Sequence, residues 1–177
     1  MFFRALVTLS LTALPFTAFA TDAPRVSLAA AAHQADAVVV ATIGSPTAEF
    51  QAIPGTGEGP RAYVRMRWRV QLQEIVVANG ATSARAGTGL ARNTTILVDQ
   101  AGWRADLAEH LRCAGGNSPC QWPKRPELDT SLSRPPRAGD SVLVLLKQTP
   151  DGWQLALDLG FDGAARAAEL RAAKRAK

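Results

Sequence analysis

The clearest pattern along the chain is an alternation of apolar and polar residues over positions 61–73. The even positions there carry Ala, Val, Met, Trp or Leu, whereas the odd positions carry Arg, Tyr or Gln. Because successive side chains of a strand point to opposite faces, this period of two predicts one long strand with an apolar face inward and a basic face outward. We expect residues 74–78 to extend the strand through a bulge, and Asn79-Gly80 to form the turn that ends it.

Apolar runs elsewhere predict further strands. Residues 37–43 and 141–147 are apolar at nearly every position, which is typical of strands buried on both faces. Residues 94–99 give a third run. A hairpin turn at residues 150–152 then leads into residues 153–159, where apolar positions alternate again.

Three segments have a helical composition. The Ala-rich residues 27–36 begin with Ser27, whose side chain favours the N-cap position. Residues 103–112 contain helix formers, with two leucines four positions apart. Residues 163–177 are rich in Ala and Arg, and Asp162 precedes them as a natural N-cap. We therefore expect the chain to end in a basic helix.

Stretches rich in Gly and Pro separate these elements. Residues 44–61 and 80–93 are predicted to be long loops, and residues 119–136, with five prolines, an irregular excursion. Five strands with turn-linked pairs and short peripheral helices predict a mainly β fold. The expected architecture is a small closed or partly open antiparallel β-barrel, OB-like, with a C-terminal helix.

The order of these segments carries a resemblance. The run from Ala35 to Ile43 after a short helix, the long strand that ends at Asn79-Gly80, the cysteine-bearing loop and residues 139–145 resemble exported OB-type domains, as in the netrin and metalloproteinase-inhibitor modules. The resemblance covers most of the mature chain and implies a fold without an activity. The first mature residue, Thr21, is not a cysteine, so the metal-chelating N-terminus of those inhibitors is not carried over.

The first twenty residues predict a cleavable secretory signal. Arg4 gives a basic start, residues 5–16 carry no charge, and Ala18 and Ala20 form a small-x-small cleavage site. A membrane anchor is the alternative, but the apolar run is shorter than the ~20 residues that span a bilayer. We therefore expect a periplasmic or secreted protein without a transmembrane segment after cleavage. Its predicted organisation is a signal at 1–20, a β-barrel domain at 21–160 and a C-terminal basic helix at 161–177.

Composition adds little to this. Cleavage would leave 177 − 20 = 157 residues, which is one domain's worth. The chain has 20 basic and 15 acidic residues, and removal of Arg4 leaves a net charge of 19 − 15 = +4. This balance supports weak attraction to an anionic surface but does not identify one.

The two cysteines, Cys113 and Cys120, are separated by turn-forming residues. In an oxidising compartment this spacing predicts a disulfide. A metal site would recruit His110 and would still lack a fourth ligand, and a redox pair would normally be Cys-x-x-Cys. We therefore expect no metal and no cofactor.

One motif is reminiscent of an enzyme. Gly139-Asp140-Ser141 resembles the Gly-Asp-Ser nucleophile of an esterase family, but no histidine follows residue 110 to act as its base. A turn before a strand accounts for the same residues. The sequence therefore predicts a chain that is not an enzyme.

The best candidate for a binding face is the basic side of the long strand. Arg65, Arg67 and Arg69 lie two positions apart, at about 6.5–7 Å spacing, and share their side with Tyr63. The arginines either bind a ligand or are paired with carboxylates across the sheet. We expect an exported, non-enzymatic domain that binds a protein or an anionic envelope polymer, and we do not expect nucleic acid as the partner. A cell-envelope hydrolase with an unrecognised carboxylate site, or a structural assembly component, remain the alternatives.

Overall fold

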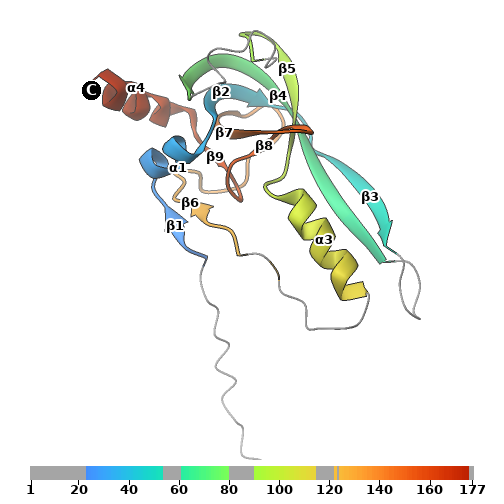
Figure 1. Ribbon diagram of the computed structural model, residues 1–177. Coiled ribbons are helices and arrows are strands. Elements are labelled where there is room, and N and C mark those ends of the chain that lie inside the picture. The colour runs from blue at the N-terminus through green and yellow to red at the C-terminus, as the bar shows by residue number, and fades with distance from the viewer. Residues whose placement is uncertain (1–22, 54–60, 80–89, 115–121, 123, 176–177) are drawn as a thin grey trace, which may run out of the picture.

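The computed structural model describes residues 23–53, 61–79, 90–114, 122 and 124–175 (Figure 1). The predicted signal peptide and Cys120 lie outside the described residues. The signal cleavage and the disulfide of Cys113 with Cys120 therefore stay predictions.

Five strands form a closed ring (Figure 1). The first, β2, pairs with both β4 and β7, and the order β2-β4-β5-β8-β7 returns to its start. The neighbours are antiparallel except for the parallel pair β5–β8. The predicted mainly β, OB-like class is confirmed as this ring of five strands with a C-terminal helix. The ring strands are β2 (Ala37–Ile43), β4 (Arg61–Ala78), β5 (Thr95–Asp99), β7 (Ser141–Thr149) and β8 (Gly152–Leu155).

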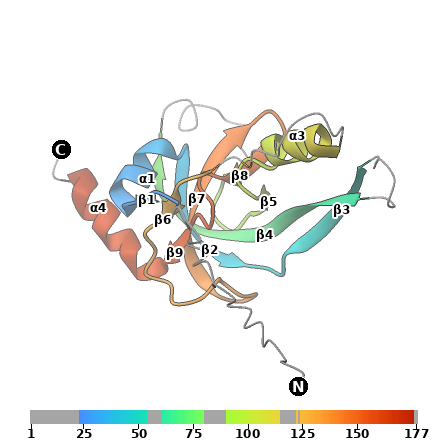
Figure 2. The ribbon, with the colours of Figure 1, turned by 90° about the horizontal axis from the view of Figure 1, so that it is seen from below.

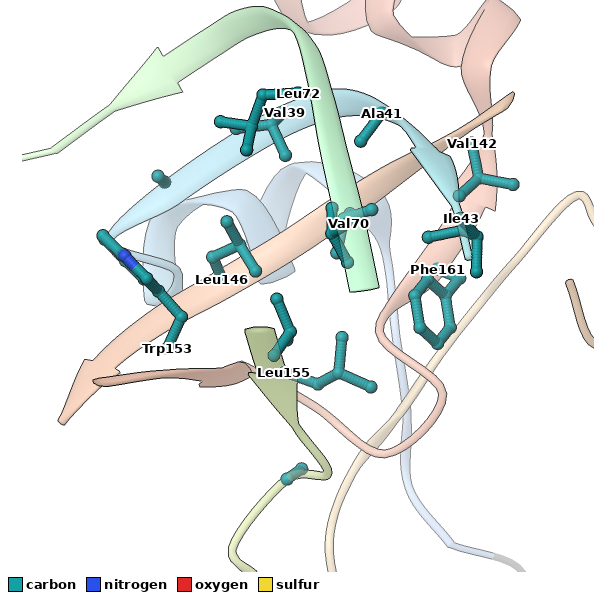
Figure 3. Packing of buried hydrophobic residues seen from close by; sticks show 14 residues of the cluster. Val39, Ala41, Ile43, Val70, Leu72, Val142, Leu146, Trp153, Leu155 and Phe161 are labelled. Atoms are coloured by element: carbon teal, nitrogen blue, oxygen red, sulfur yellow. The ribbon is translucent and has the colours of Figure 1, made fainter. Parts of the chain in front are cut away.

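The ring encloses the main core. Alternate side chains of each strand point inward, and Figure 3 shows Val39, Leu72 and Leu146 gathered among the strands of the ring. Trp153 and Phe161 fill the remaining space, and the ring of Phe161 meets that of Trp68 edge-on, with 5.6 Å between centroids. A side-chain period of two thus places one face of each strand in a common interior.

A second core lies outside the ring. Val38 and Leu145, which neighbour inward-facing residues, pack against Leu28 of α1 and Leu170 of α4. Both faces of β2 and β7 are therefore buried, which explains their unbroken apolar runs. The helices that cover this side are α1 (Leu28–Gln34) and α4 (Ala167–Arg175), and Ser27 caps α1 as predicted.

The C-terminal helix begins later than predicted. Residues Phe161–Gly163 form a strand, β9, that pairs with β7, and a 3₁₀ turn, η1 (Ala164–Arg166), precedes α4. Asp162 is not the N-cap. Its fully buried carboxylate accepts hydrogen bonds from Ser131 N and Oγ, each 2.7 Å away, and from Arg166 Nη1 at 2.7 Å. Burial of this charge requires such donors, so it fixes the approach to the helix.

Two short strands run beside the second core. These are β1 (Arg25–Val26) and β6 (Glu127–Leu128), which pair in parallel. They attach the start of the described chain to the proline-rich segment.

A two-stranded arm extends from the ring (Figure 1). Its outer strand, β3 (Thr47–Ile53), pairs with β4 and was expected to be part of a loop at 44–61. That prediction is wrong at 47–53 because Gly and Pro flank this segment without entering it, and apolar residues at 48, 50 and 52 alternate with polar residues at 47, 49 and 51. Helix α3 (Trp103–Ala114) runs beside the arm in both views (Figure 1 and Figure 2).

Candidate functional site

The arm presents two chemically different faces. On one face, Glu49 lies opposite Arg65, and Gln51 opposite Tyr63. On the other face, Phe50 lies opposite Val64. The polar face meets α3, and the apolar face points away from it.

The polar face is organised by one buried carboxylate. Asp99, at the end of β5, accepts hydrogen bonds from Arg65 Nε to Oδ1 at 2.8 Å and from Arg65 Nη2 to Oδ2 at 2.6 Å. Arg67 Nε donates to Asp99 Oδ1 at 2.9 Å, and its Nη1 donates to Glu49 Oε1 at 2.8 Å. The guanidinium of Arg65 also lies 3.7 Å from the ring centroid of Trp103. Such bidentate, stacked geometry fixes both arginines in place.

The prediction that this basic side of the long strand faces solvent is wrong for Arg65 and Tyr63. Arg65 is 8% exposed and Tyr63 4% exposed, because α3 covers this part of the strand. Arg69 alone of the predicted set is well exposed. The hydrogen bond from Arg67 to Asp99 raises the pKa of its guanidinium. Arg65 and Arg67 thus match the alternative of arginines paired with carboxylates across the sheet.

Tyr63 lies among aromatic and polar neighbours beneath α3. Gln100 Nε2 donates a hydrogen bond to Tyr63 Oη at 2.8 Å, and the ring of His110 lies edge-on at 5.1 Å between centroids. His110 also meets Trp122, with ring centroids 4.5 Å apart. Burial, reinforced by the nearby charge of Asp106, raises the pKa of Tyr63 to about 12.

The pKa of Tyr63 gives a direct test of this burial. Tyr63 is the single tyrosine of the chain, so tyrosinate absorbance reports it alone. We expect a midpoint near pH 12 in the folded protein and near its ordinary value of about 10 in denaturant. Because the pKa of Tyr63 is higher in the folded state, its contribution to folding stability is complete below about pH 10. That contribution is lost as the pH rises toward 12. Equal midpoints in the two states would contradict a buried phenol.

Arg125 holds α3 at its N-terminal end. Its Nη1 donates to Asp106 Oδ2 at 3.0 Å, and its Nη2 donates to the Gly102 carbonyl at 3.1 Å. Gly102 has a φ of +58°, and a Cβ there would lie 2.3 Å from Arg125 Nε. The site therefore needs glycine on both steric and conformational grounds.

The apolar face of the arm is exposed. Phe50 is 72% exposed and Val64 37% exposed. The residues that share this face are Ala48, Phe50, Ala52, Ala62, Val64 and, partly buried near the ring, Met66. All are apolar, so the sheet presents one continuous apolar strip to solvent. The sequence carried a signal for it, since even positions are apolar in both 48–52 and 62–66.

The Gly139-Asp140-Ser141 motif has the structural role expected of a turn. Asp140 accepts a hydrogen bond from the Arg137 backbone N–H at 2.8 Å, and Ser141 begins β7. Ser141 Oγ donates to Gln73 Oε1 at 2.9 Å. The hydroxyl is therefore engaged with an amide on the neighbouring surface.

A hollow lies away from the arm. A pocket of about 200 Å³ opens between α1, the end of β4 and α4, where Ala32, Val77 and Leu170 form apolar walls beside His33 and Lys174. Within the described ranges, no three His, Cys, Asp or Glu side chains gather closely enough to hold a metal ion. No helix in that part of the chain is both long and apolar enough to cross a membrane.

Comparisons of this chain with family models, with curated proteins and with solved structures gave no match. The likeness to the netrin and metalloproteinase-inhibitor modules therefore stays a resemblance of fold class. What the chain does has to be inferred from its own surfaces.

Proposed function

We propose that this chain is an exported, non-enzymatic binding domain, and that the apolar face of its arm docks a protein partner. The observation that carries the proposal is the strip around Phe50 and Val64. An exposed apolar strip on a rigid sheet is typical of a protein contact. Large aromatic side chains at such a surface tend to dominate binding energy.

Charge favours a protein over an anionic polymer. Two of the three arginines predicted to attract anions are engaged with Asp99 and Glu49. Their positive charge is largely balanced within the chain, which leaves Arg69 as the exposed member. An anionic polymer would need to displace these contacts, whereas a protein partner needs only to cover the apolar strip.

Replacing Phe50 by Lys tests this proposal. We expect the variant to recover roughly tenfold less partner than the natural chain when each is used to capture proteins from envelope extract. Phe50 is mostly exposed, so the fold should survive, and circular dichroism checks that. The matched control is Leu97→Lys, which changes a 52% exposed leucine on β5. Equal recovery by the natural chain and by Phe50→Lys would reject the arm as the docking surface.

A further inference from the structure

The outer strand of the arm has an open edge. Over its whole length, from Thr47 opposite Arg67 to Ile53 opposite Arg61, β3 pairs with β4. Among the described strands, β4 is its sole neighbour, and β3 lies at the outside of the arm (Figure 2). Alternate backbone N–H and C=O groups of an edge strand face away from the sheet and can pair with another strand.

The edge carries little that would discourage such pairing. Natural edges are commonly protected by Lys, Pro, bulges or inward-pointing charges. The seven residues of β3 contain no Lys, Pro or Gly, and their pairing with β4 is regular. The one charge is Glu49, and Arg67 Nη1 already donates to its Oε1 at 2.8 Å. The strand is therefore open to a partner in both shape and charge.

The residue pattern of β3 suits a second copy of the same strand as its partner. When the strand pairs antiparallel with a second copy about an axis at Phe50, Glu49 lies opposite Gln51 of the second copy, and Ala48 lies opposite Ala52 of the second copy. An axis at Glu49 would set two carboxylates against each other, which is unfavourable. An axis at Gln51 would set Glu49 against the buried Ile53. Pairing about Phe50 avoids both faults, because it sets Glu49 against neither a carboxylate nor an apolar side chain, and only its end pair, Thr47 opposite Ile53, joins a polar with an apolar residue.

Charge is also complementary in this register. Within one copy, Arg65 lies opposite Glu49 across the β3–β4 pair. The second copy would add its Gln51 on the other side of Glu49. The amide of that Gln51 can donate a hydrogen bond to the Glu49 carboxylate. The acid would thus lie between a cation and an amide, with no like charge beside it.

We propose that two copies of this chain associate antiparallel through β3, with Phe50 at the two-fold axis. This inference goes beyond the proposed function, since it places a second copy at the edge of β3 and leaves the apolar face of the arm uncovered. The pairing would join the two arms into one four-stranded sheet with a continuous apolar face. It also gives the alternative of an assembly component a physical basis.

The size of the interface sets its strength. Seven residues per copy form an interface smaller than the roughly 800 Å² per partner of stable complexes. The dimer is therefore weak, with a dissociation constant on the order of 10 μM. Sedimentation velocity of the purified exported protein should show a monomer at about 1 μM and mostly dimer at about 500 μM.

Two substitutions at one position test the register. Gln51→Lys places a cation opposite Glu49 of the second copy, so the dimer should tighten about fivefold. Gln51→Glu places a carboxylate there instead, and the dimer should weaken by about fivefold or more. Leu97→Lys, on β5 of the ring and outside the β3 edge, should leave the dissociation constant unchanged. A general effect on folding cannot move Lys and Glu variants in opposite directions.

The outcomes separate this inference from the proposed function. A chain that stays monomeric at about 500 μM overturns self-pairing, and so do Gln51→Lys and Gln51→Glu variants with equal dissociation constants. If self-pairing fails while Phe50→Lys still loses its captured partner, the docking surface stands with another occupant. If the chain dimerises as described while Phe50→Lys captures normally, the dimer stands and docking of an extract protein fails.

Discussion

Replacing Asp99 by Asn is expected to lower the free energy of unfolding by about 3–5 kcal/mol. Asp99 is 6% exposed and accepts hydrogen bonds from Arg65 and Arg67. An amide cannot balance the guanidinium charge of Arg65, which would stay buried between the sheet and Trp103. Denaturant unfolding of the two proteins measures the difference.

Two controls give this prediction its meaning. Asp151→Asn removes the carboxylate of an ion pair with Arg104, whose side chain is 67% exposed, and should cost less than about 1 kcal/mol. Replacing Arg65 by Met and Asp99 by Leu together should recover much of the loss, because no charge is left unpaired. A loss below about 1 kcal/mol for Asp99→Asn would mean that the arm and ring are not joined through this carboxylate.

Replacing Leu146 by Ala should cost about 2–5 kcal/mol. Leu146 is fully buried inside the ring, where it packs with residues of β2, β4 and β8. Truncation removes buried apolar surface and leaves a cavity that a closed ring of strands has little freedom to fill. The same denaturant measurement applies.

The neighbouring residue sharpens this result. Leu145 faces the second core, beneath α1 and α4, and is also fully buried. Leu145→Ala should therefore cost a similar 2–5 kcal/mol, whereas Leu97→Ala on β5 should cost less than about 1 kcal/mol. If only one of the two adjacent leucines mattered, β7 would not be buried on both faces.

The local pattern was enough to find the strands of the ring. Unbroken apolar runs gave β2 and β7, and the period of two over residues 61–73, with the predicted extension through a bulge to residue 78, gave β4. The pattern could not give the neighbours of each strand, since pairing depends on contacts far apart in the sequence. It missed β3 because the Gly and Pro residues around 47–53 outweighed a weak alternation built on two alanines.

The candidate site was predicted in part. Parity correctly placed Arg65, Arg67 and Tyr63 on one side of β4, and arginines paired with carboxylates across the sheet were one of the two alternatives for that side. It could not show that α3 covers that side, because α3 lies far from this part of β4 in the sequence and meets it only through tertiary packing. Glu49 was hidden in a segment predicted to be a loop, so the apolar strip beside it was overlooked as well.

The length of β4 has a consequence for anything that docks on the arm. The same strand pairs with β3 near its start and with β2 near its end, and Arg67 pairs with both Thr47 and Asp99. Neither Gly nor Pro interrupts it between residues 61 and 78, so the arm has no hinge where it leaves the ring. Ordering a backbone costs about 1–2 kcal/mol per residue, and here folding has already met that cost. The arm is thus preorganised: a flexible partner would lose entropy on docking, whereas a second copy would bring a strand that is already ordered.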